Sequence, residues 1–105
     1  MATYGLAEVE FKLKKFDEAK SKFQDFTIVY PEHELIPKAQ EYIEKSALKS
    51  GIKAFEANEF TKAKERFDQF KTEFPNSDKI DKVDDYLKKL SAMPETTAEE
   101  SNDNS

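Results

Sequence analysis

The chain has 105 residues, a length typical of one domain. Hydrophobic and charged residues each make up 37% of it, a balance that favours an elongated stack of helices, because a stack exposes more surface per residue than a globule. It has no cysteine, which excludes disulfide and thiol chemistry. We expect no signal peptide and no membrane span, since no run approaches the roughly 20 apolar residues that a spanning helix needs.

The net charge of −5 is unevenly distributed along the chain. The last eleven residues contain no Lys or Arg and hold four acids: Glu95, Glu99, Glu100 and Asp103. The remaining body carries 17 basic and 18 acidic side chains and is nearly neutral. Because no basic stripe with interleaved aromatic residues stands out, we expect no nucleic-acid binding.

In chain order, residues 2–13 predict the first helix. Tyr4, Ala7 and Phe11 form one stripe along it. A second apolar set lies beside that stripe: Leu6, Val9 and Leu13. So wide an apolar face is expected for a helix that packs on two neighbours.

One motif occurs twice and organises the whole chain. Phe16 to Pro31 and Phe60 to Pro75 share the pattern F-x-x-A-x-x-x-F-x-x-F-x-x-x-[YF]-P, 44 residues apart. Within each copy the Ala, the two inner Phe and the last aromatic residue are spaced i, i+4, i+7 and i+11, which is one face of an α-helix. The proline ends each helix, because the residue before a proline is biased away from helical dihedrals. The pattern predicts a helical repeat protein.

Between the two motifs we predict one long helix over residues 34–57. A division near Ser46 is the alternative, but no Gly, Pro or Asn marks a loop there. Asn58 is a candidate left-handed cap at its end. A further helix is expected to begin after the turn at Pro75, with its N-cap in that turn and Asp78 as its first residue.

The predicted fold is therefore all-α: helical hairpins stacked as a short solenoid of about five helices, one of them long. Within a domain over residues 1–91 we expect two repeats, about 1–33 and 34–77, and a capping helix at 78–91. Residues 92–105 are polar and acidic without periodicity, which is typical of a disordered tail.

The repeat resembles the tetratricopeptide repeat at the positions where helices of that family pack together. The matching residues are the small Ala7 and Gly51, the central Ala19 and Ala63, the aromatic Phe23 and Phe67, and the closing Pro31 and Pro75. Phe26 and Phe70 stand where the family usually has Ala. That departure, with the aromatic-Pro ending, is similar to the subfamily of the outer-membrane assembly lipoprotein BamD and the Tol-Pal protein YbgF (CpoB).

The spacing of 44 residues exceeds the usual 34 of the family, and the surplus falls in the long helix. Prolonged helices of this kind are a feature of BamD-like proteins, as the resemblance implies. Two repeats are fewer than the three or so that a stable stack needs, so we expect the chain to be a C-terminal fragment of a longer protein. Pairing with itself or with another subunit is the alternative.

No catalytic, cofactor or metal site is predicted. His33 is the only histidine and has no second nitrogen or sulfur ligand near it in the pattern. The Phe stripe is interpreted as core. The carboxylates alternate with basic residues on helix faces, as in the run of Lys62, Lys64, Glu65, Arg66 and Asp68, and a solvated face with i,i+4 pairing explains them. No nucleophile–base arrangement or phosphate-binding loop can be assembled, so we do not expect an enzyme.

Binding of other proteins is the remaining function. In tetratricopeptide hairpins the first helix of each pair lines a concave groove, and the resemblance transfers that role to six residues. They are Tyr4, Glu8 and Lys12 in the first repeat and Leu48, Ile52 and Phe55 in the second. Glu8 and Ile52 stand where the family's chaperone-tail clamp has Asn, which argues against that activity. An exposed Ile52 and Phe55 would form an apolar groove or a face covered by a neighbouring repeat.

The resemblance implies a non-catalytic, cofactor-free scaffold for protein–protein interaction in outer-membrane protein assembly or cell-envelope maintenance. Its partners would be envelope assembly subunits or peptide segments at the periplasmic face of the bacterial outer membrane. The alternative is a short cytoplasmic tetratricopeptide adaptor or a self-associating structural module.

Overall fold

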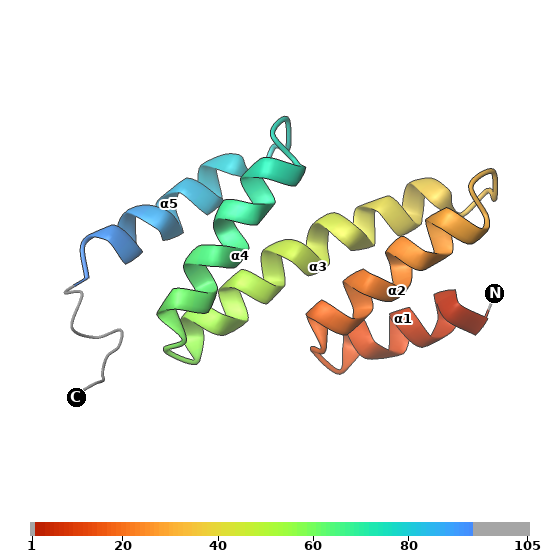
Figure 1. Cartoon of the computed structure of the whole chain (residues 1–105), viewed down its shortest axis with the longest axis horizontal. Helices are drawn as coiled ribbons and strands as arrows, with labels where there is room; N and C mark the ends of the chain where they lie inside the picture. Colours follow the sequence, from red (N-terminus) through yellow and green to blue (C-terminus); the bar gives the residue numbers. More distant parts are fainter. Residues whose placement is uncertain (1, 94–105) are drawn as a thin grey trace. The chain divides into compact units, whose positions relative to one another are not determined.

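The computed structural model describes residues 2–93, which fold entirely into helices joined by short turns (Figure 1). The helices are α1 (Ala2–Lys12), α2 (Phe16–Val29), α3 (Ile36–Glu56), α4 (Phe60–Glu73) and α5 (Ile80–Ser91). This confirms the all-α class and the long third helix. Most of the tail expected from residue 92 onward lies outside the described residues.

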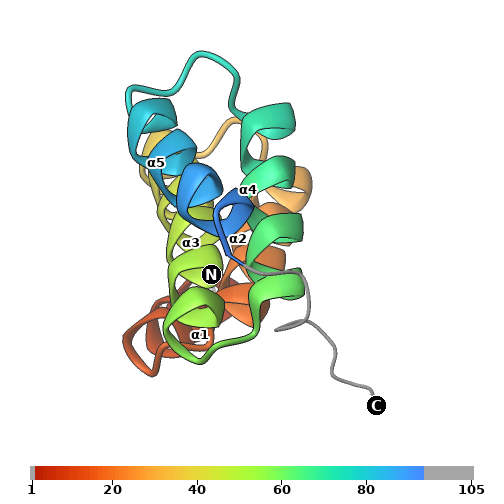
Figure 2. The same cartoon turned by 90° about the vertical axis from the view of Figure 1, so that its left-hand side faces the viewer.

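The chain divides within α3 into two compact units, Met1–Ser50 and Gly51–Ser105. The first unit holds α1, α2 and most of α3, and its α1 packs antiparallel to α2. The second unit holds the end of α3 together with α4 and α5, which lie side by side in both views (Figure 2). Each unit is therefore built around one copy of the repeated motif.

Matching left-handed residues end the first helix of each hairpin. Lys14 and Asn58, 44 residues apart, both have φ of 64°. The residue after each one donates its N–H to a carbonyl five residues earlier: Lys15 to Glu10 at 2.8 Å and Glu59 to Ala54 at 2.8 Å. These bonds satisfy carbonyls that the helix end would leave unpaired. The cap expected at Asn58 is confirmed, whereas the cap at Lys14 was not predicted.

In each turn that follows a motif helix, a side chain accepts a hydrogen bond from the backbone N–H two residues later, although the side chains differ. In the first turn the N–H of Leu35 donates to Nδ1 of His33 at 3.0 Å. In the second turn the N–H of Lys79 donates to the hydroxyl of Ser77 at 3.0 Å. The predicted N-cap in this turn is wrong, because the N-cap of α5 is Lys79, without a side-chain cap bond, and the helix begins at Ile80, two residues later than predicted. Ser77 instead closes the turn before the helix. His33 acts here as a turn residue that accepts a backbone hydrogen bond.

The bond to His33 can be tested by exchanging the residue types of the two turns. We expect His33→Ala to lower the free energy of unfolding by about 1 kcal/mol, because the N–H of Leu35 loses its acceptor. His33→Ser should recover most of this loss, since a serine performs the same task at residue 77. Thermal unfolding followed by circular dichroism would measure both. Equal losses of stability in the two variants would show that His33 stabilises the turn through packing of its ring and not through this hydrogen bond.

In the first unit the core is a set of aromatic rings contributed by all three helices. The ring of Tyr42 on α3 stacks on Phe23 of α2, with centroids 4.5 Å apart and planes at 4°. Phe11 of α1 meets Tyr42 edge-on at 5.1 Å and Phe16 edge-on at 5.3 Å. Phe23 is fully buried, so the interpretation of the Phe stripe as core is confirmed here.

The second unit repeats this arrangement 44 residues later. Tyr86 of α5 stacks on Phe67 of α4, with centroids 4.9 Å apart and planes at 13°. Phe55 of α3 meets Tyr86 edge-on at 5.1 Å and Phe60 edge-on at 5.7 Å. Pairs of this geometry add about 0.5–1.5 kcal/mol each beyond the area they bury. The same three ring contacts, made by four rings, therefore organise both units.

Gly51 allows the end of α3 to approach α4 closely. A Cβ added to it would lie 2.7 Å from the ring of Phe67, a buried ring held by its stack with Tyr86. The equivalent residue in the first unit is Ala7, which is fully buried. A small residue is thus needed at this position, as the resemblance to the tetratricopeptide repeat implied.

A matched pair of glycine variants tests this close approach. Gly51→Leu should lower the free energy of unfolding by roughly 1–3 kcal/mol, because the new side chain displaces the Phe67 ring. Gly5→Leu makes the same change in α1, where a Cβ would meet nothing within 4 Å, and should instead stabilise the helix by up to about 1 kcal/mol. Thermal unfolding of dilute protein would measure both. Similar losses in both variants would contradict the steric explanation.

Candidate protein-binding surface

Of the groove residues predicted in the first repeat, Tyr4 belongs to the core. Its side chain is only 7% exposed, and its ring packs edge-on against Phe23 at 5.4 Å and Phe26 at 5.1 Å. A side chain enclosed in this way cannot present a surface to a partner. The expectation that Tyr4 faces a groove is therefore corrected, because α1 turns this residue toward α2.

Glu8 and Lys12 remain available on the same helix. Glu8 is half-buried, and its carboxylate accepts a hydrogen bond of 3.4 Å from the hydroxyl of Tyr42. Lys12, one turn further along α1, is exposed. The two side chains place opposite charges at i and i+4 on one side of α1, next to the aromatic core.

The charge of Glu8 affects the two tyrosines near it. Burial, followed by the negative charge of Glu8, raises the pKa of Tyr4 above its ordinary value of 10.0. Burial raises the pKa of Tyr42 in the same direction, and the charge of Glu8 and the hydrogen bond to it add to the shift. Both causes favour the neutral phenol, because an ionised phenolate would be poorly solvated and would face a carboxylate.

The raised pKa of Tyr42 makes stability fall at alkaline pH. The folded state keeps the phenol proton to higher pH than the unfolded state, so this contribution is complete below pH 10.0 and is lost as the pH rises through the folded pKa. We expect Tyr42→Phe to lose less stability than the parent chain as the pH is raised above 10. Melting temperatures across that range would measure the difference, and Tyr30→Phe, at an exposed phenol, is the control. Parallel pH profiles for parent and Tyr42→Phe would contradict this assignment.

The residues predicted in the second repeat are also divided between core and surface. Leu48 is only 6% exposed and belongs to the core. Phe55 is half-buried and holds the rings of Phe60 and Tyr86, so its expected exposure is not observed. Ile52 is half-buried, as Phe55 is.

Ile52 and Glu8 are equivalent positions with different chemistry. In the first unit Glu8 accepts the hydrogen bond from Tyr42. In the second unit Tyr86 takes the place of Tyr42, and the aliphatic Ile52 takes the place of Glu8. Tyr86 is instead approached by Lys89, whose Nζ lies 5.2 Å from the ring centroid. The surface next to the aromatic core is thus acidic in one repeat and apolar in the other.

Sequence reasoning missed a second surface feature, the exposure of large apolar side chains in the first unit. On α1 and just after it, Leu6 is 54% exposed, Val9 51% and Leu13 60%. We expected these residues to pack on a second neighbouring helix. Within residues 2–93 they remain more than half exposed. A comparison of the repeats could have indicated this, because the equivalent residues Ser50, Lys53 and Ala57 include no large apolar side chain.

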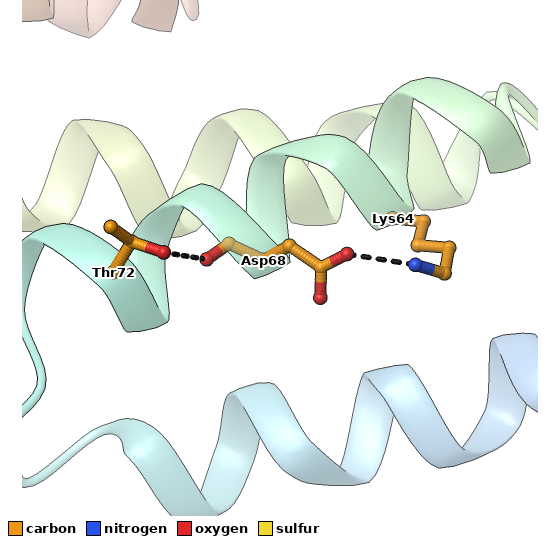
Figure 3. A network of polar contacts seen from close by, with 3 residues as sticks. All are labelled: Lys64, Asp68 and Thr72. Atoms are coloured by element: carbon orange, nitrogen blue, oxygen red, sulfur yellow. Dashed lines mark hydrogen bonds and ion pairs between the residues drawn. The ribbon is translucent and has the colours of Figure 1, made fainter.

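The outer face of α4 is solvated and paired, as expected from its alternating charges. Lys64 Nζ lies 2.8 Å from the carboxylate of Asp68, and the hydroxyl of Thr72 donates to the carbonyl of Asp68 at 3.1 Å (Figure 3). The bond to Asp68 raises the pKa of Lys64. Lys71 forms a further ion pair with Asp84 of α5 at 2.7 Å. The Lys64–Asp68 pair confirms the i,i+4 pairing predicted for the charged run over residues 62–68.

Residues 2–93 contain neither a metal-binding cluster nor a membrane-spanning helix. Within that range no three His, Cys, Asp or Glu side chains gather in a way that could hold a metal ion. Over the same residues, no helix combines the length and the apolar character that crossing a membrane requires.

The fold and its surface define a helical repeat protein without an evident chemical centre in its described part. A family model described as Tetratricopeptide repeat matches residues 1–33 and 46–77, well over half of the chain. The chain therefore belongs to the tetratricopeptide repeat family. No curated protein and no solved structure matches it.

The two matched segments contain the two copies of the motif, Phe16 to Pro31 and Phe60 to Pro75. They leave out residues 34–45, which fall mostly in the first half of α3. This is the surplus that lengthens the spacing between copies to 44 residues. Tetratricopeptide repeats generally mediate protein–protein interaction, and they typically serve as scaffolds that carry out no catalysis.

Proposed function

We propose that this protein is a non-catalytic scaffold that binds other proteins through the first helix of each repeat, and that it acts in the bacterial cell envelope in the manner of BamD and YbgF. The observation that carries the binding proposal is the pair of matched tetratricopeptide repeats. The envelope role rests on the resemblance of the motif, with Phe26 and Phe70 in place of the family's usual Ala and with its aromatic-Pro ending.

The binding residues are those of the predicted groove that remain accessible. In the first unit they are Glu8 and Lys12, which offer one charge of each sign. In the second unit the residue is Ile52, an aliphatic side chain beside the aromatic core. A partner segment with an apolar anchor for Ile52 or with charged side chains for Glu8 and Lys12 suits this surface, because apolar anchors supply most of the energy at such interfaces.

Ile52→Glu tests the apolar part of this surface without disturbing the fold. Glutamate already occupies the equivalent position 8, next to an equivalent tyrosine, so the second unit should accept it. We expect affinity for the physiological partner to fall at least about tenfold, because a charge would replace the apolar contact. Thr61→Glu, at an exposed position of α4, is the control for added charge.

The partner can be identified by placing a photoreactive amino acid at residue 52 in living cells. Adducts with outer-membrane assembly or Tol-Pal subunits are the expected result. Fractionation should place the protein in the periplasm or at the outer membrane. Adducts with cytoplasmic proteins alone, and a cytoplasmic location, would replace the envelope role with that of a cytoplasmic adaptor.

A further inference from the structure

The two tyrosines that stack on the motif helices have different polar neighbours. In the first unit the hydroxyl of Tyr42 donates to the carboxylate of Glu8 at 3.4 Å. In the second unit no side chain among residues 2–93 accepts a hydrogen bond from the hydroxyl of Tyr86. The polar group nearest its ring is instead the ammonium group of Lys89. The second unit thus has a cation at the tyrosine where the first unit has an anion.

Lys89 is placed on the open side of the Tyr86 ring. Its Nζ lies 5.2 Å from the ring centroid. Because one face of the ring is stacked on Phe67, the ammonium group lies over the other face. Lys82, Tyr86 and Lys89 are spaced i, i+4 and i+7, so they share one side of α5. Both lysines are exposed, and within the described part of the chain neither forms an ion pair.

A phenol donor next to two ammonium groups favours an anion, because charge-assisted hydrogen bonds to a carboxylate are the strongest that these groups can make. The first unit shows that a carboxylate fits beside the stacked tyrosine, since Glu8 occupies that place. In the second unit the equivalent residue is the aliphatic Ile52, which cannot accept a hydrogen bond. The group that the second unit lacks is therefore a carboxylate from outside its helices.

Two nearby carboxylates of the second unit do not fill this role. Asp85 precedes Tyr86, but it lines a cleft on the other side of α5. Glu56 lies one helical turn after Ile52 on α3. Both are exposed, and neither is paired with Lys89. Their charges repel a further carboxylate over α3, so they favour its placement over Lys89.

We propose that residues 94–105, the acidic segment, fold back onto this surface and place Glu99 or Glu100 against the Tyr86 hydroxyl and the Lys89 ammonium group. The acidic segment lies outside the described residues, but its sequence complements the surface, because it has four acids and no Lys or Arg. A contact within one chain also needs little intrinsic affinity, since a short linker gives an effective concentration in the millimolar range.

The acidic segment is long enough to make this contact. Tyr86 lies seven residues before Met93, which is about 10 Å along a helix. Glu99 lies six residues after Met93, and six extended residues span up to about 20 Å. Pro94 disfavours a helical conformation at Met93, so the chain is expected to leave the axis of α5 there. The segment can therefore reverse its direction and return to Tyr86.

The other exposed side of α5 suits the acidic segment less well. The cleft there is lined by three carboxylates and two lysines: Asp81, Asp84, Asp85, Lys71 and Lys88. Lys71 is already paired with Asp84 at 2.7 Å. An acidic segment in this cleft would meet more negative than positive charge. The side that carries Tyr86 and Lys89 is therefore the better fit.

Docking of the acidic segment would regulate partner binding, a consequence that rests on the proposed function of Ile52. The segment would cover the surface beside Tyr86, where the partner is proposed to bind. Partner and segment would then compete, and the apparent affinity would fall by the fraction of chains whose surface is free. The acidic segment would act in this way as an internal inhibitor.

Docking can be measured without any partner, by NMR of the full chain. The chain contains no cysteine, so Ser101→Cys carries a single nitroxide label. A docked segment should broaden the methyl signals of Ile52 more than those of Leu87, which lines the cleft on the opposite side of α5. Lys89→Glu should abolish this preference by repulsion. Ile52→Glu should abolish it too, because it supplies the carboxylate from within the unit, as Glu8 does in the first.

The first unit provides the matched control for these variants. Lys45→Glu changes the exposed residue equivalent to Lys89 and should leave the broadening pattern unchanged. Salt at 1 M, where the Debye length falls to about 3 Å, should release the segment. An undocked segment would broaden Leu87 at least as much as Ile52, because Leu87 is closer to the label along the chain. That result in the parent chain would overturn the proposal and leave the surface to an acidic segment of another protein.

The regulatory consequence has a separate measurement. Changing Glu99→Gln together with Glu100→Gln should raise the affinity for the physiological partner about three- to tenfold, because the competing segment is lost. An unchanged affinity, with docking demonstrated by the label, would contradict Ile52 as a partner-binding residue and not the docking itself. The two proposals therefore fail in distinguishable ways.

Discussion

The stack of a tyrosine on the central phenylalanine of the motif is the interaction on which both units depend. Tyr42 covers Phe23 in the first unit, and Tyr86 covers Phe67 in the second, with ring centroids 4.5 Å and 4.9 Å apart. Each stack joins the motif helix to the helix that follows it. The small residue at position 51 completes the arrangement in the second unit, because it lets α3 close on the Phe67 ring. Rings held this tightly leave little freedom for the helices that carry them.

This core determines which side chains of the first helix in each hairpin can reach a partner. Phe11 and Phe55 are used to meet the tyrosine edge-on, so the next accessible positions on that side are Glu8 and Ile52. The two repeats thus present the same location with opposite character, one acidic and one aliphatic.

Much of the fold follows from the sequence because the repeated motif specifies it twice. The spacing of Phe23, Phe26 and their copies predicted the buried face, and Asn58 predicted a left-handed cap. Accessibility was harder to predict, because it depends on how each helix is rotated against its neighbours. Tyr4 and Leu48 were therefore placed in a groove, although both are buried. Unlike the cap at Asn58, the cap at Lys14 could not be predicted from its residue type, since lysine has no preference for positive φ.

The differences between the two repeats carry more information about function than their similarities. Residues common to both copies maintain the aromatic core, and the structure accounts for them through packing alone. Leu6, Val9 and Leu13 differ in this respect, because the second repeat has Ser50, Lys53 and Ala57 at the equivalent positions. There Ser50 is buried, and its hydroxyl donates to the carboxylate of Asp17 on α2 at 2.6 Å, so that position is covered within the chain. The three equivalent residues of α1 are apolar and each more than half exposed, which stabilises nothing inside the first unit.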